Sequence, residues 1–62
     1  TYPWEANKFH FLRSPIDGIQ FADDRIILVE FKSGGSRLSK NQRHIRDLVN
    51  GGEVYFEVIK VA

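Results

Sequence analysis

Two apolar runs in the first half of the chain surround a short polar segment. Residues 18–28 are mainly hydrophobic on both sides of residues 22–25, which include the adjacent acids Asp23 and Asp24. Paired aspartates favour a tight turn and disfavour a strand. The pattern therefore predicts a β-hairpin whose two loop residues are Asp23 and Asp24.

Counting outward from that loop gives each residue of one strand a partner on the other, and it places Asp17 opposite Glu30. Because side chains alternate across a strand, Lys32 emerges on the same face as Glu30. A shift of one residue in the pairing would turn Asp17 to the other face. The predicted pairs are Ala22 with Arg25, Phe21 with Ile26, Gln20 with Ile27, Ile19 with Leu28, and Gly18 with Val29.

Two facing acids at the end of a hairpin suggest a metal site. Opposed Cβ atoms lie about 4.5–5.5 Å apart, so carboxylates at Asp17 and Glu30 repel each other unless a cation lies between them. Mg²⁺ or Mn²⁺ suits this position because both prefer carboxylate, carbonyl and water oxygens. The alternative is a pair of ordinary solvated charges. The apolar run at residues 26–29 favours the metal site, since it is typical of a strand covered on both faces that ends at a sheet rim.

The second half of the chain predicts a loop and then a helix. Ser39, with Gln42 three residues later, forms a capping box that opens a helix of about three turns, ending at Asn50-Gly51. Helical periodicity turns Gln42 toward the apolar side that centres on Ile45. Gln42 then either reaches a metal-bound water or a phosphate, or packs at the boundary with its amide bonded to the backbone.

The remaining elements complete the expected fold. Residues 53–61 alternate as a last strand, and residues 8–13 are expected to form an edge strand at the front. A strand-helix-strand unit needs a crossover, which places residues 53–61 parallel to residues 25–31. The predicted fold is therefore α/β, a small mixed sheet in which a β-hairpin is followed by a right-handed β-α-β crossover.

Composition limits the classes of protein to which the chain can belong. Its 62 residues make one small domain, and chains of this length bury only about 60% of their unfolded surface, so a partner chain or a further segment is expected to add stability. The absence of cysteine excludes disulfides and thiolate zinc sites. No apolar run approaches the roughly 20 residues that cross a bilayer.

Two roles are open for the aromatic residues near the N-terminus, and two are open for the basic residues. The aromatic residues Tyr2, Trp4 and Phe9 either stack on a base or close a small core or dimer interface, which is the commoner role. The net charge is only +1, but a basic cluster falls within ten residues at the start of the predicted helix. It either binds DNA phosphates or forms a solvated helix face. The cluster consists of Arg37, Lys40, Arg43 and Arg46.

Three separated blocks of sequence occur in a specific order. They are Phe11-Leu12-Arg13-Ser14-Pro15-Ile16-Asp17-Gly18-Ile19, Val29-Glu30-Phe31-Lys32-Ser33-Gly34 and Arg37-Leu38-Ser39-Lys40-Asn41-Gln42-Arg43. Together they resemble the PD-(D/E)XK nuclease superfamily, which has a restriction-endonuclease-like core. More narrowly, they resemble the Holliday junction resolvase-related endonuclease domain of archaea and bacteria. The resemblance covers residues 9–58.

The resemblance implies a role for each matching position. Asp17 and Glu30 would bind Mg²⁺ or Mn²⁺ together with the backbone carbonyl of Phe31. Lys32 would orient or activate the attacking water and stabilise charge on the phosphate, and Gln42 would position water or phosphate. The implied partner is DNA, and superfamily nucleases typically leave a 5′ phosphate and a 3′ hydroxyl.

The chain departs from the family pattern at its start, where relatives commonly carry an N-terminal helix. Residues 1–62 are therefore expected to be a single minimal nuclease core, a fragment that lacks the N-terminal helix. A homodimer is also expected, since cutting two strands requires two sites, and the resemblance implies a prokaryotic cytoplasmic protein associated with the nucleoid.

Three classes of function remain open. The leading one is a metal-dependent DNA endonuclease that acts on branched or Holliday-junction DNA. The second is a non-catalytic DNA-binding or scaffold domain that retains the fold. The third, an oligomerisation module without nucleic acid, fits poorly with the joint presence of Asp17, Glu30 and Lys32.

Overall fold

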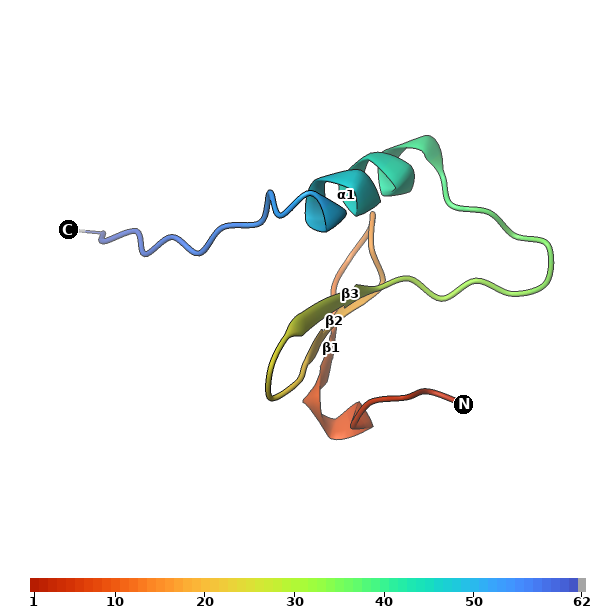
Figure 1. Cartoon of the computed structure of the whole chain (residues 1–62), viewed down its shortest axis with the longest axis horizontal. Helices are drawn as coiled ribbons and strands as arrows, with labels where there is room; N and C mark the ends of the chain where they lie inside the picture. The colour runs from red at the N-terminus through yellow and green to blue at the C-terminus, as the bar shows by residue number, and fades with distance from the viewer. Residues whose placement is uncertain (62) are drawn as a thin grey trace.

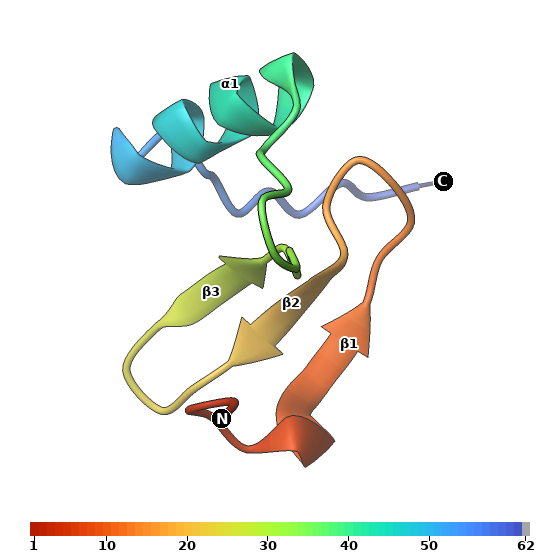
Figure 2. The ribbon, with the colours of Figure 1, turned by 90° about the vertical axis from the view of Figure 1, so that its right-hand side faces the viewer.

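The computed structural model describes residues 1–61, which form a three-stranded antiparallel sheet with one α-helix beside it (Figure 1). The strands lie side by side in the order β1-β2-β3, so β1 and β3 are the two edges (Figure 2). Within residues 1–61, no helix has the length and hydropathy needed to span a bilayer. In chain order the elements are the 3₁₀ turn η1 (Ala6–Lys8), β1 (Phe9–Phe11), β2 (Gly18–Phe21), β3 (Ile26–Val29) and α1 (Lys40–Asn50).

The β2–β3 hairpin has the register that the acidic turn predicts. Phe21 pairs with Ile26, and Gly18 pairs with Val29 at the far end. The turn closes with the Ala22 amide donating to the Arg25 carbonyl at 2.9 Å. Asp23 and Asp24 are thus the loop residues, and the predicted hairpin is confirmed.

Strand β1 confirms the predicted edge strand over the shorter range Phe9–Phe11, and it pairs with β2. Gly18 makes this pairing possible. A Cβ atom at Gly18 would collide with the Phe9 ring and lie 2.7 Å from the His10 carbonyl oxygen. The glycine therefore lets an aromatic ring lie directly over the backbone of β2.

Gly18→Ala is expected to destabilise the protein by about 1–3 kcal/mol, the usual cost of adding a methyl group to a packed position. The Phe9 ring can move, but the His10 carbonyl belongs to the backbone of the paired strand. Gly35→Ala is the matched control, since a Cβ atom there meets nothing within 4 Å. Thermal unfolding followed by circular dichroism compares the two variants, and equal melting temperatures would contradict the packing account.

The N-terminal residues are tied to the sheet by a buried amide. Gln20 on β2 is 0% exposed. Its side-chain oxygen accepts a hydrogen bond from the Tyr2 hydroxyl at 2.6 Å, and its nitrogen donates to the carbonyls of Glu5 at 2.7 Å and Phe21 at 3.2 Å. Because a buried amide is costly when unpaired, these bonds hold residues 1–8 against β2.

Aromatic rings gather on the face of the sheet that carries Phe9. The ring of Phe9 lies 6.1 Å from that of Tyr2 and 5.8 Å from that of Phe31, and the ring planes are steeply inclined. Edge-to-face packing of this kind contributes about 0.5–1.5 kcal/mol per pair beyond buried area. The contacts form a small aromatic cluster on one face of the sheet, and this cluster is partly open to solvent, since Phe31 is 51% exposed.

Helix α1 begins and ends where the sequence predicts. The Ser39 side chain accepts a hydrogen bond from the Gln42 amide, and the Gln42 side chain accepts one from the Ser39 amide, so the predicted capping box is confirmed. At the other end the Gly51 amide donates to the Asp47 carbonyl at 2.9 Å. Gly52 has a φ of +76°, a conformation that glycine adopts without strain.

The predicted last strand and the mixed sheet are wrong for this structure. Residues 53–61 form no strand, and all the strand pairs among residues 1–61 are antiparallel. An alternating sequence indicates which side chains would share a face of a strand. A strand also needs a neighbouring strand to bond to its backbone, and residues 53–61 have no such neighbour within residues 1–61. They extend away from α1 (Figure 1), and the radius of gyration is 13.5 Å against about 10.6 Å for a compact chain of this length.

Candidate active site

Asp17 and Glu30 lie at the open end of the hairpin, opposite the turn. Asp17 comes immediately before β2, and Glu30 comes immediately after β3. The Asp17 amide donates to Glu30 Oε1 at 3.0 Å, and the Phe31 amide donates to Asp17 Oδ2 at 2.9 Å. Each carboxylate is therefore held by a backbone amide of the other chain segment. The hairpin register brings both acids to one end of the sheet.

The second oxygen of Glu30 joins two further side chains. Glu30 Oε2 lies 3.1 Å from Lys32 Nζ and accepts a hydrogen bond from Gln42 Nε2 at 3.1 Å. The side chains of Glu30 and Lys32 are 14% and 32% exposed, so this ion pair is better shielded from water than a typical surface pair. Lys32 lies beside Glu30, as the sequence predicts, although both residues follow the end of β3.

Gln42 connects the helix to both sides of the site. Its side-chain nitrogen donates to the Pro15 carbonyl at 2.8 Å as well as to Glu30, while its oxygen completes the helix cap at Ser39. The first turn of α1 is therefore fixed over the segment that leads into Asp17. The amide bonds to the backbone, as one of the two interpretations of Gln42 requires, and it also contacts Glu30; contact with a metal-bound water or a phosphate stays a prediction.

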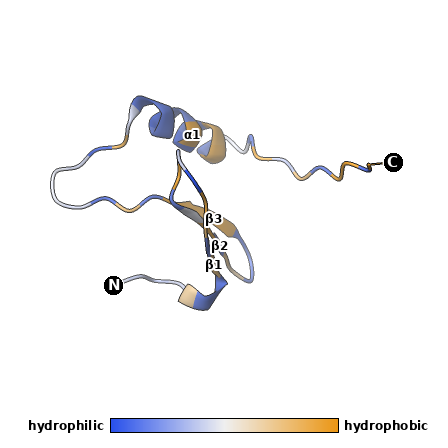
Figure 3. Cartoon of the chain, turned by 180° about the vertical axis from the view of Figure 1, so that it is seen from behind, coloured by the Kyte–Doolittle hydropathy of each residue, from blue (hydrophilic) through white to orange (hydrophobic). Residues whose placement is uncertain are grey.

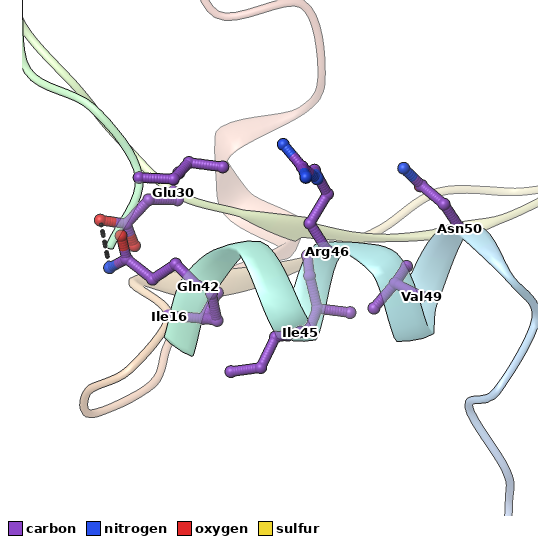
Figure 4. A pocket seen from close by; sticks show the side chains of 9 residues that line it. Ile16, Glu30, Gln42, Ile45, Arg46, Val49 and Asn50 are labelled. Atoms are coloured by element: carbon purple, nitrogen blue, oxygen red, sulfur yellow. Dashed lines mark hydrogen bonds between the residues drawn. The ribbon is translucent and has the colours of Figure 1, made fainter. Parts of the chain in front are cut away.

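A groove runs from this cluster along α1. Its walls are mainly apolar, and Glu30 and Gln42 form one end (Figure 4). Arg46 lies further along the same groove. The residues that line it are Ile16, Leu28, Glu30, Leu38, Gln42, Ile45, Arg46, Val49 and Asn50.

The four basic residues are exposed but do not converge on the acids. Arg43 donates to the Leu38 carbonyl at 2.9 Å, which holds it near the helix start, and Arg46 pairs with Asp47 at 3.0 Å. Arg37 lies in the loop before α1, Lys40 is the first residue of the helix, and both are exposed. Of these four residues, only Arg46 lines the groove, while all four side chains are exposed to solvent.

The site carries the donor types that a hard cation requires. Within residues 1–61 there is no group of three or more His, Cys, Asp or Glu side chains, so a cation here depends on two carboxylates plus carbonyl and water oxygens. Mg²⁺ commonly binds in this way, since it retains several waters and takes one or two carboxylates from the protein. Asp17, Glu30 and the Phe31 carbonyl fit that requirement.

Sequence reasoning missed the backbone groups that hold the site. The amides of Asp17 and Phe31 orient the two carboxylates, and the Pro15 carbonyl accepts from Gln42. The hairpin register brings these segments close, because its last pair is Gly18 with Val29, but just beyond that pair the amides donate to side-chain carboxylates and not to backbone carbonyls. The contact between Gln42 and the Pro15 carbonyl could not be predicted in this way, since it depends on how α1 docks on the loop before β2.

Comparison with known proteins gives one result for the whole described chain. The family model for "endonuclease related to archaeal Holliday junction resolvase" matches residues 1–61. No curated protein and no solved structure matches the chain. The matched region contains Asp17, Glu30, Lys32 and Gln42 in the arrangement described above. The chain therefore belongs to the family of endonucleases related to archaeal Holliday junction resolvase.

Proposed function

We propose that the protein is a divalent-metal-dependent DNA endonuclease that hydrolyses phosphodiester bonds in branched DNA. The observation that carries this proposal is the Glu30 network, in which one carboxylate contacts the Asp17 backbone, the Lys32 ammonium and the Gln42 amide. Two acids and a lysine at one sheet end match the needs of phosphodiester hydrolysis, and the family is one of endonucleases.

The chemistry requires charge neutralisation around an anionic substrate. A bound Mg²⁺ would neutralise phosphate oxygens and lower the pKa of its water. Asp17 and Glu30 would hold it, and the Phe31 carbonyl is a third oxygen donor. The backbone amides on Asp17 Oδ2 and Glu30 Oε1 keep both carboxylates oriented before a ligand arrives, which reduces the reorganisation needed for binding.

Lys32 supplies the remaining positive charge. Its ammonium is 3.1 Å from Glu30 Oε2 and is partly exposed, so it can exchange a carboxylate oxygen for a phosphate oxygen at little structural cost. A cation placed where charge develops stabilises the transition state more than the ground state. Gln42 keeps Glu30 in place from the helix side and offers an amide close to the same position.

The proposed substrate is DNA with an accessible phosphate at a branch. The site lies at an open sheet end and not in an enclosed cavity, and the exposed basic residues of α1 and of the loop before it would provide sequence-independent contacts to phosphates. The relation to Holliday junction resolvase in the family description supports a branched substrate over a linear one.

A direct test incubates purified protein with a four-way junction, a flapped duplex and a linear duplex of matched sequence. Cleavage of the branched DNA is expected with Mg²⁺ or Mn²⁺, is lost on adding a chelator, and leaves 5′ phosphate ends. If none of the three substrates is cut with either metal, the proposal fails. Preferential cleavage of the linear duplex would overturn the branched-substrate part alone.

The basic cluster is expected to determine the affinity for DNA and not the rate of cleavage. Lys40→Ala should weaken DNA binding and reduce the slope of log affinity against log salt by about 1, because one phosphate contact is lost. Lys8→Ala is the control, since Lys8 lies near the hairpin turn and faces Glu5 and Asp23. Filter binding or fluorescence anisotropy across a salt series measures the slope. An unchanged slope in Lys40→Ala would remove Lys40 from the interface.

A further inference from the structure

Phe31 connects the candidate active site with the aromatic cluster. Its amide donates to Asp17 Oδ2 at 2.9 Å, and its ring packs on the rings of Tyr2 and Phe9. Strand β3 ends at Val29, so the ladder of the hairpin does not fix the backbone of Phe31. The contacts of the Phe31 ring therefore help to determine where its amide and its carbonyl lie.

Two aromatic rings support the ring of Phe31. The centroid of the Phe9 ring lies 5.8 Å away, and that of the Tyr2 ring lies 6.1 Å away. Phe9 is itself held by the pairing of β1 with β2 and by the space above Gly18. Because Phe31 is 51% exposed, the two rings cover it on one side and leave the other side open to solvent. Displacement of Tyr2 would remove one of these two supports.

The sheet fixes the position of Tyr2 through a side-chain amide. Tyr2 lies outside every helix and strand, but Gln20 Oε1 accepts a hydrogen bond from its hydroxyl at 2.6 Å. Gln20 lies on the middle strand and pairs with Phe9 on one side and with Ile27 on the other. Ladders on both sides therefore hold Gln20, and one short hydrogen bond transmits its position to the Tyr2 ring.

Packing alone does not explain a glutamine at position 20. The adjacent strand β3 is hydrophobic along its length (Figure 3), and a buried amide needs a partner for each of its polar atoms. Gln20 has these partners, because its nitrogen donates to the carbonyls of Glu5 and Phe21 in addition to the bond from Tyr2. A buried amide whose bonds are all satisfied selects one arrangement of the chain, which an apolar side chain does not.

We propose that Tyr2 and Gln20 are positioning residues of the candidate metal site and act on it through Phe31. Gln20 holds the Tyr2 hydroxyl, and the Tyr2 ring supports the ring of Phe31. The backbone of Phe31 then orients Asp17 and offers its carbonyl oxygen to the cation. The inference rests on the proposed function, because it concerns the same metal site.

A small displacement of Phe31 is expected to weaken metal binding strongly, since it affects two oxygen donors at once. Its amide orients the Asp17 carboxylate, and its carbonyl is the third protein ligand proposed for the cation. Mg²⁺ requires near-ideal octahedral geometry, and functional sites need their groups held within about 0.5 Å. Residues that hold metal ligands in place typically contribute about 10–100-fold to metal affinity.

The first test measures Mn²⁺ binding from the electron paramagnetic resonance of the free ion, without DNA. Tyr2→Ala and Gln20→Leu are each expected to weaken binding at least about tenfold, and Tyr2→Phe, which keeps the ring, should fall between Tyr2→Ala and the unaltered protein. Phe21→Ala is the matched control, because Phe21 also lies on β2 but packs on His10, and its affinity should stay at the parental value. Folded Tyr2→Ala and Gln20→Leu proteins with parental Mn²⁺ affinity would overturn the proposal.

The second test needs neither metal nor DNA, and it holds even if Tyr2→Ala does not fold. Nuclear magnetic resonance follows the exchange of the Phe31 amide with water in the unaltered protein and in Tyr2→Phe. Loss of the bond to Gln20 is expected to speed this exchange at least about twofold, the low end for one hydrogen bond. The Ala22 amide, which bonds to the Arg25 carbonyl in the hairpin turn, should exchange at the parental rate. An unchanged Phe31 rate, or an equal acceleration at Ala22, would refute the link.

Failure of this inference can be distinguished from failure of the proposed function. An unaltered protein that binds no Mn²⁺ and cleaves no DNA would refute the proposed function, and the exchange rate of the Phe31 amide would still decide whether Tyr2 holds that backbone. If the unaltered protein binds Mn²⁺ and the Tyr2 and Gln20 variants match it in both measurements, the inference alone is wrong.

Discussion

Lys32→Ala is expected to lower DNA cleavage by about 10²–10³-fold, the cost of removing one group that stabilises charge in a transition state. DNA binding and folding should change little, because the lysine side chain is partly exposed and packs on no core. Glu30 keeps its hydrogen bonds from the Asp17 and Gln42 nitrogens in this variant. Single-turnover cleavage of a four-way junction gives the rate, and anisotropy with the same DNA gives the affinity.

Lys8→Ala is the control for Lys32→Ala, because it removes a lysine that lies outside the candidate active site. Lys8 also lies near two carboxylates, at 3.6 Å from Glu5 and 3.8 Å from Asp23, but at the opposite end of the hairpin. It should cleave at the parental rate. If Lys32→Ala cleaves as fast as the parent, Lys32 has no catalytic role and the proposed mechanism is wrong.

Asp17→Asn is expected to weaken metal binding, and the cleavage activity of the variant is expected to depend on the metal that is supplied. The asparagine oxygen can still accept the Phe31 amide hydrogen bond that Asp17 Oδ2 accepts at 2.9 Å, so the local backbone should be retained while one negative charge is lost. The metal concentration for half-maximal cleavage should rise at least about tenfold, the lower end of the cost of disturbing a metal ligand's surroundings. Raised Mn²⁺ should restore part of the activity.

Titrating Mg²⁺ and Mn²⁺ against cleavage distinguishes Asp17→Asn from Lys32→Ala. No metal concentration should rescue the lysine variant, because its missing charge is not a metal ligand. Asp23→Asn is the control for removing an acid, since Asp23 lies in the hairpin turn. An Asp17→Asn protein with an unchanged metal requirement would exclude Asp17 from the metal site.

The hairpin and the arrangement of the acids were predictable because one local feature fixes both. A two-residue loop at Asp23-Asp24 sets the register, and the last pair of that register, Gly18 with Val29, brings Asp17 and Glu30 together just beyond the strands. The capping box was predictable for the same reason, since Ser39 and Gln42 satisfy each other within one helical turn. Local chemistry determines these elements.

The features that the sequence did not reveal depend on distant partners. Residues 53–61 have the period of a strand, but a ladder forms only where another strand presents its edge. The sequence did not indicate the role of Gln20, because its side-chain amide bonds to Tyr2 and Glu5 only after residues 1–8 fold back against β2. The Pro15 contact of Gln42 likewise required the docking of α1 on the preceding loop.

The most direct measurement of the central claim is the anomalous diffraction of a crystal soaked in Mn²⁺. A single strong peak is expected within coordination distance of the Asp17 and Glu30 carboxylates and the Phe31 carbonyl, with Lys32 Nζ outside the coordination shell. Such a peak would establish the cation position on which the proposed hydrolysis depends. A Mn²⁺ peak elsewhere, or the absence of a peak beside Asp17 in crystals with that site open to solvent, would contradict the account.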